Sequence, residues 1–73
     1  MHTAPKGYEF INDYSESPRV GFVFEWSPVF NIWLDVVAIV TICPGELAGS
    51  AYLREFGKSL GDRMVFVAAD SPA

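Results

Sequence analysis

The sequence predicts an α+β fold, in which a three- to four-stranded, mainly antiparallel sheet carries one helix packed on one face. Two observations support this fold class. Several segments are rich in β-branched and aromatic residues, which fit the pleated surface of a sheet. One later segment places its apolar residues at helical spacing between a proline and a glycine. With 73 residues, the chain is expected to form a single small domain, in which residues 1–7 are a flexible arm and residues 70–73 a tail.

The apolar segment Ile32–Cys43 is the one around which the sheet is expected to form. Its second half is mostly β-branched, so we predict a strand over Val36–Ile42, buried on both faces at the centre of the sheet. The residues before it admit two interpretations. Either Ser27 caps a short helical turn over Pro28–Leu34, or Asn31–Cys43 is one long strand. We favour a loop or single turn there, because strands seldom exceed about 10 residues.

Three further strands are predicted over Tyr8–Ile11, Val20–Trp26 and Arg63–Ala69. The last of these is apolar on both faces, which suits an interior position in the sheet. In the second, strict alternation places four large apolar side chains on one face, which we expect to be the core side: Val20, Phe22, Phe24 and Trp26.

A helix is predicted over Pro44–Gly61, because proline suits the first turn and glycine suits the position after the last. Glu46 near its start and basic residues near its end complement the helix dipole. The stripe expected to pack on the sheet is Gly49, Tyr52, Leu53, Phe56 and Leu60. The opposite face, expected to be ordinary surface, carries Leu47, Ala51, Arg54 and Lys58. One helix covers one face of a sheet, so aromatic residues or a partner must cover the other.

Charge and apolar patterning exclude two classes of partner. The net charge is −4, from nine acidic and five basic residues, and no basic run is present. Direct nucleic-acid binding as the primary function is therefore not expected, whereas a basic patch on a protein would be complementary. The apolar stretch 29–43 is too short to span a membrane and is interrupted by Asn31 and Asp35. Residues 1–7 contain one lysine and no apolar run follows them directly, so they are not expected to belong to a signal peptide.

The few reactive side chains argue against enzymatic activity. The single histidine is His2 and the single cysteine is Cys43, so neither a catalytic constellation nor a metal site is predicted. We expect no cofactor. A lone cysteine also excludes an internal disulfide, which fits a reducing cytoplasm, and Cys43 itself is expected to be a small buried apolar residue. Trp26 and Trp33 are expected in the core rather than as platforms for a ligand.

The candidate contact residues for a protein partner are aromatic and acidic. Aromatic side chains beside charges are typical of interface hot spots. For Glu9, Asp13 and Glu16, the alternative interpretation is a solvated acidic loop. Arg54 and Lys58 on the outer face of the helix are additional candidate contacts. The candidates in the N-terminal quarter are Tyr8, Glu9, Phe10, Asp13, Tyr14 and Glu16.

The length, acidity, aromatic content and opening residues Met1–Gly7 together resemble the small RNA polymerase-binding transcription regulators of Xanthomonas-infecting phages. The resemblance covers the whole chain but carries no diagnostic motif, so it assigns no individual residue. It implies binding to the β and β′ subunits of the host RNA polymerase, including the β′ N-terminal segment near the RNA exit channel. The consequences would be displacement of the σ factor, inhibition of initiation and antitermination at intrinsic terminators.

A monomer in the cytoplasm of the infected bacterial host is the expectation that goes with this resemblance. The alternative, from a different class, is a small membrane-associated or complex-stabilising subunit. An inhibitor of CRISPR effectors is a third possibility within the binding class, and the sequence does not separate it from the first.

Overall fold

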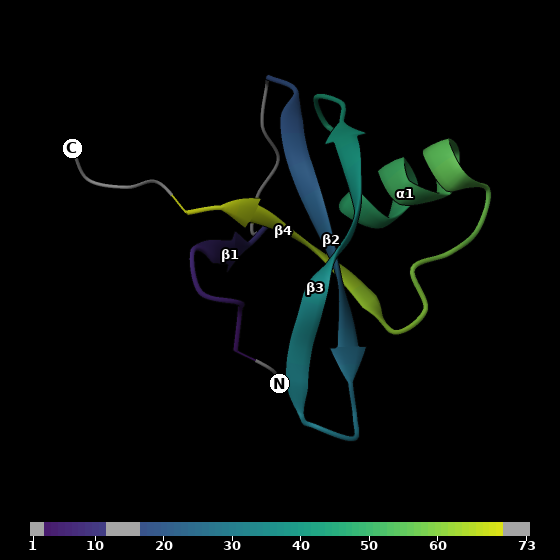
Figure 1. Ribbon diagram of the computed structural model, residues 1–73. Helices are drawn as coiled ribbons and strands as arrows, with labels where there is room; N and C mark the ends of the chain where they lie inside the picture. The colour runs from purple at the N-terminus through teal and green to yellow at the C-terminus, as the bar shows by residue number, and fades with distance from the viewer. Residues whose placement is uncertain (1–2, 12–16, 70–73) are drawn as a thin grey trace.

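The computed structural model describes residues 3–11 and 17–69. The four strands form one antiparallel sheet in the order β1-β4-β2-β3, and the helix lies beside β3 (Figure 1). This architecture confirms the predicted α+β class with one helix on the sheet. The elements, in chain order, are β1 (Tyr8–Phe10), β2 (Arg19–Ser27), β3 (Ile32–Ile42), α1 (Ala48–Phe56) and β4 (Arg63–Ala68).

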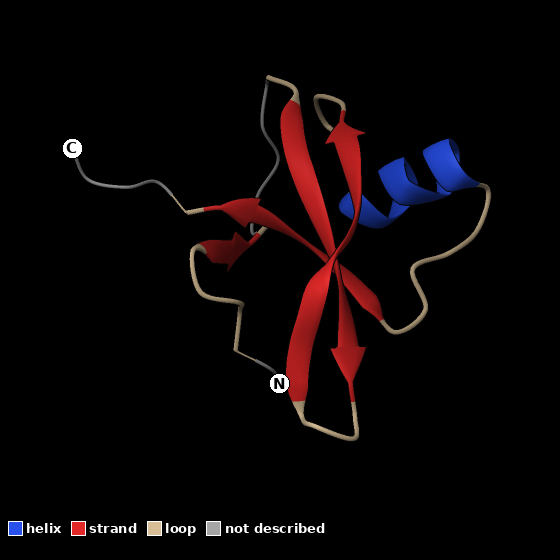
Figure 2. Cartoon of the chain, in the orientation of Figure 1, coloured by secondary structure: helices blue, strands red, loops and turns tan. Residues whose placement is uncertain are grey.

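β2 and β3 form a long twisted hairpin that dominates the molecule (Figure 2). Ser27 holds its turn, because its carbonyl oxygen accepts a hydrogen bond from Asn31 N at 2.8 Å and its Oγ accepts one from Phe30 N at 3.2 Å. The predicted loop or helical turn up to Leu34 is therefore wrong, since β3 already begins at Ile32. The long strand is supported because the nine-residue β2 pairs with it along its whole length, with two shifts of register.

The prediction that Val36–Ile42 is the central strand is also wrong. β3 lies at the edge of the sheet, while β2 and β4 occupy its interior. Even within Val36–Ile42, two apolar side chains remain open to solvent, Val37 at 49% and Ile39 at 58% exposure. A β-branched run favours a strand, but it does not determine which neighbours that strand will have.

The core between the sheet and α1 is built mainly from small and branched side chains. Gly21 lies in its middle, where an added Cβ would come within 2.5 Å of Val65 Cγ1. A glycine is therefore required here so that the side chains of neighbouring strands can fill the space. The buried residues of this core are Val23, Val40, Ile42, Ala51, Tyr52 and Val65.

α1 is shorter than predicted at both ends. It ends at Phe56 because Gly57 adopts the left-handed conformation, with φ of 71°, and its N–H donates to Leu53 O at 2.8 Å. The residues before it form a turn instead of a first helical turn, with Glu46 N donating to Cys43 O at 3.0 Å.

The face of α1 that packs on the sheet also differs from the predicted stripe. Ala51, which was placed on the outer face, is fully buried together with Tyr52, whereas Leu53 and Phe56 are exposed. Ala48, Ala51 and Tyr52 follow the i, i+3, i+4 spacing of one helical face. The two alanines explain the choice of this face, because small side chains let the helix approach the sheet closely.

The opposite face of the sheet is covered by aromatic rings that pack on one another. Phe66 lies at the centre and is fully buried, with the rings of Phe10, Phe24 and Trp33 at centroid distances of 5.2, 5.5 and 5.1 Å. Tyr8 packs edge-to-face on Phe24 at 4.8 Å. The aromatic residues of the strands thus form a second core on the face that no helix covers.

The segment before β1 lies against this aromatic core. The indole Nε1 of Trp33 donates to Thr3 O at 2.8 Å, and Gly7 O accepts from Ala69 N at 3.0 Å. The flexibility expected for residues 1–7 stays a prediction. The tail 70–73 lies outside the described residues.

Candidate protein-binding surface

The feature that stands out is a set of exposed apolar side chains along the β2–β3 hairpin, which project from its turn and from both faces of the sheet. Val29 and Phe30 at the turn are 82% and 70% exposed. Single exposed apolar residues are ordinary on any protein, but a run of them on one hairpin is typical of an interaction surface. We call this set the hairpin strip: Val20, Val29, Phe30, Ile32, Leu34, Val37 and Ile39.

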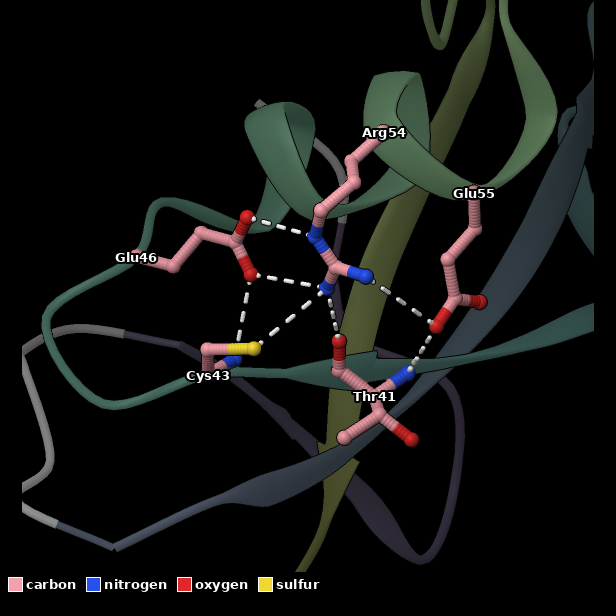
Figure 3. A network of polar contacts seen from close by, with 5 residues as sticks. All are labelled: Thr41, Cys43, Glu46, Arg54 and Glu55. Carbon is pink, nitrogen blue, oxygen red and sulfur yellow. Dashed lines mark hydrogen bonds and ion pairs between the residues drawn. The ribbon is translucent and has the colours of Figure 1, made fainter.

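Side chains of α1 contact the edge of β3 at Thr41 (Figure 3). Thr41 N donates to Glu55 Oε1 at 3.3 Å, and Thr41 O accepts from Arg54 Nη2 at 2.8 Å. These two side chains occupy the donor and the acceptor that a further strand would otherwise use. An edge strand protected in this way resists pairing with other chains at that point.

Arg54 is held in place by a bidentate ion pair. Its Nε and Nη2 lie 3.0 and 2.9 Å from the two carboxylate oxygens of Glu46, whose Oε1 also accepts from Cys43 N at 3.1 Å. These hydrogen bonds lower the pKa of Glu46 from 4.5 to about 2, first through Arg54 and then through the backbone of Cys43. The same pair raises the pKa of Arg54. Both side chains are thus charged throughout the physiological pH range.

Cys43 is exposed, which contradicts the expectation that it is buried. It directly follows β3, in the turn that leads to α1, where the chain leaves the sheet. Its Sγ lies 3.6 Å from Arg54 Nη2, so the thiol borders the network in Figure 3.

Asp35, near the middle of β3, is a second residue whose side chain occupies a backbone group of this strand. Asp35 Oδ1 accepts a hydrogen bond from Val36 N at 2.7 Å, just where the register of β3 against β2 shifts. Between this contact and Thr41, the edge retains an open stretch around Ile39.

A shallow cleft of about 460 Å³ lies at the other end of β3, next to the hairpin turn. The indoles of Trp26 and Trp33, with centroids 5.0 Å apart, form its apolar wall. Lys6 adds a positively charged side chain to its lining. The remaining lining residues are Thr3, Pro5, Asn31 and Ile32.

The structure brings together some of the candidate contact residues predicted from the sequence. Tyr8 and Phe10 lie on the aromatic face, half-buried. Glu9 alternates with them and therefore lies on the other face of the sheet, where it is exposed. Arg54 lies on α1 and belongs to the network at the β3 edge. Lys58 is exposed and follows the end of α1. Asp13, Tyr14 and Glu16 lie outside the described residues.

Sequence reasoning missed the hairpin strip. A usable signal was present in Pro28-Val29-Phe30-Asn31, where two large apolar residues occupy a turn that normally favours small and polar ones. Phe30 has no strand neighbour to bury it, so its exposure follows once the turn is assigned.

Neither a metal-binding cluster nor a membrane-spanning helix is found in the part of the chain that the structure describes. Within residues 3–11 and 17–69, no group of three or more His, Cys, Asp or Glu side chains is arranged to hold a metal ion. In the same ranges, no helix has the length and apolar character needed to cross a membrane.

The fold and surface together define a small α+β domain with an exposed apolar hairpin. We compared the chain with models of protein families, with characterised proteins and with solved structures, and none of them matches.

Proposed function

We propose that this chain is a phage-encoded regulator that binds the host RNA polymerase through its β and β′ subunits. By displacing the σ factor it inhibits initiation at host promoters, and it promotes antitermination. The resemblance to small polymerase-binding regulators supports the identity of the partner. The hairpin strip is the observation that carries the binding function.

Burial of the hairpin strip in an interface would lower the free energy of the complex, which favours binding. Each large apolar side chain that moves from water into an interface contributes about 1.5–3 kcal/mol. Phe30 and Val29, at the tip of the turn, are the side chains with most to gain. The net charge of −4 complements a basic surface and would accelerate association with it at low salt.

The test is retention of purified host RNA polymerase by the immobilised protein, combined with transcription from a σ-dependent promoter. The unmodified chain should retain the β and β′ subunits, release the σ factor and reduce transcript. Val29→Ser with Phe30→Ser should weaken retention by about ten-fold or more, since two apolar anchors are lost. Leu47→Ser with Leu53→Ser removes two exposed apolar residues, at 59% and 52% exposure, from the helix side of the molecule and is the matched control. Absence of β and β′ from the retained fraction would reject the proposal.

A small membrane-associated subunit is the second candidate, favoured by the apolar tip at Val29 and Phe30. A hairpin tip of this kind inserts into the apolar region beneath lipid headgroups. Flotation with phosphatidylcholine vesicles distinguishes the two candidates, because the polymerase regulator should stay in the dense fraction.

A further inference from the structure

We infer that the open stretch of the β3 edge around Ile39 accepts an extended, lysine- or arginine-bearing segment of a partner protein as a fifth strand. This inference rests on the proposed protein-binding function and adds the mode of binding. It commits to a polypeptide in β conformation with basic side chains at its ends.

The backbone geometry provides the docking groups. Outward-facing and inward-facing backbone groups alternate along an edge strand. Thr41 faces outward, as its bonds to Arg54 and Glu55 show. Ile39, two residues earlier and paired with Phe22, must therefore also present its N–H and C=O outward. Unlike Thr41, Ile39 meets no guarding side chain among residues 3–11 and 17–69.

Each end of this stretch is closed by a carboxylate that a basic side chain would attract. Asp35 bonds to Val36 N, and Glu55 bonds to Thr41 N and forms an ion pair with Arg54, whose Nη1 lies 3.7 Å from Glu55 Oε1. Both carboxylates belong to exposed residues, so they can turn toward a lysine or arginine of the incoming segment. The two N–H groups released in this way would then pair with the segment, which extends the ladder on both sides of Ile39.

Charge favours a basic partner over a second copy of this chain. Each copy carries a net charge of −4 and has the carboxylates of Asp35 and Glu55 along this edge. Pairing two such edges would bring like charges together, and like charges placed opposite each other destabilise a strand pair. A basic segment would instead be attracted to the same carboxylates.

The side chains beside the open stretch complete the surface. Val37 and Ile39 are about half exposed, and alternate apolar side chains of an added strand would cover them. Main-chain hydrogen bonds would supply the affinity, and the contacts with Val37 and Ile39 would fix the register of the added strand.

The test uses a blocked octapeptide of alternating Thr and Val with a lysine at each end, and the matched peptide with glutamates instead. Fluorescence anisotropy measures the affinity of the full chain for each. Hydrogen exchange followed by NMR reports on the Ile39 amide in the wild-type complex. Proline lacks the N–H, and it is tolerated on edge strands where that N–H faces solvent, so Ile39→Pro removes the docking donor. Ile39→Thr keeps the backbone donor and is the control.

We expect the lysine peptide to bind at least about ten-fold more tightly than the glutamate peptide, with slowed exchange at Ile39. Ile39→Pro should weaken binding by about ten-fold, and Ile39→Thr by about two-fold. Asp35→Asn with Glu55→Gln should remove most of the preference for lysine. Unchanged Ile39 exchange in the saturated complex, or no binding of the lysine peptide, would overturn the inference, even if Ile39→Pro fails to fold. Failure of polymerase retention, with the peptide still bound, would reject the proposed function alone.

Discussion

At the scale of single residues, Gly21 shows most clearly how tightly the helix-side core is packed. A Cβ there would lie 2.5 Å from Val65 Cγ1 and 3.0 Å from Ile42 Cδ1. We predict that Gly21→Ala lowers the free energy of unfolding by about 1–3 kcal/mol, because branched side chains of β3 and β4 must shift. Urea denaturation measures the change. An unchanged midpoint would mean that Val65 has an alternative position at little cost.

The ion pair of Glu46 leads to a prediction about how the stability of the fold depends on pH. The pKa of Glu46 is lowered from 4.5 to about 2 in the folded chain, so its stabilising effect is fully present above about pH 4.5 and is lost as pH falls toward 2. Glu46→Gln should therefore lower the unfolding midpoint at pH 7, and the difference from the unmodified chain should shrink as pH falls through 2. Thermal unfolding across this range checks it, and added salt should reduce the difference because the pair is exposed. A constant difference at all pH values would contradict the role of the charge.

At the scale of elements, α1 carries a glycine that nothing in the packing requires. A Cβ at Gly49 would meet Leu60 Cδ1 at 3.7 Å, an ordinary contact distance. We predict that Gly49→Ala raises the free energy of unfolding by about 0.5–1 kcal/mol, since alanine loses less backbone entropy in a helix. Thermal denaturation measures the gain. Gly57→Ala is the opposite control, because its positive φ of 71° makes alanine unfavourable.

Element positions could be predicted where local pattern dominates. Alternation in β2 and the apolar run of β4 indicate these strands correctly, to within a residue or so at either end. β3 was placed at the centre of the sheet because its composition resembles that of a buried strand, whereas pairing partners depend on contacts far along the chain. The face of α1 was misassigned for a related reason. Tyr52 and Leu53 both fit an apolar stripe, and the small residue Ala51 decided which side could approach the sheet.

At the scale of the whole molecule, the sequence carries a signal for the tip of the candidate surface at Val29 and Phe30, but not for its remaining residues. The aromatic residues Tyr8 and Phe10 attracted attention as contacts, yet they pack on Phe24 and Phe66. The hairpin strip consists of residues whose apolar character predicted burial instead. Exposure is a property of the assembled sheet, because it depends on which strand lies at the edge and on where the single helix is placed.

Arg54 and Glu55 protect the β3 edge at Thr41, and the last prediction concerns their removal. Arg54→Ala with Glu55→Ala removes one positive and one negative charge, so the net charge stays at −4 while Thr41 loses both of its guards. An unguarded apolar edge strand pairs with other chains, so the double variant should show a mass that rises with concentration in light scattering. Glu25→Ala with Arg63→Ala removes another ion pair, with atoms 3.2 Å apart, on the interior strands β2 and β4 and is the matched control. Equal masses for both variants at all concentrations would show that α1 does not protect this edge.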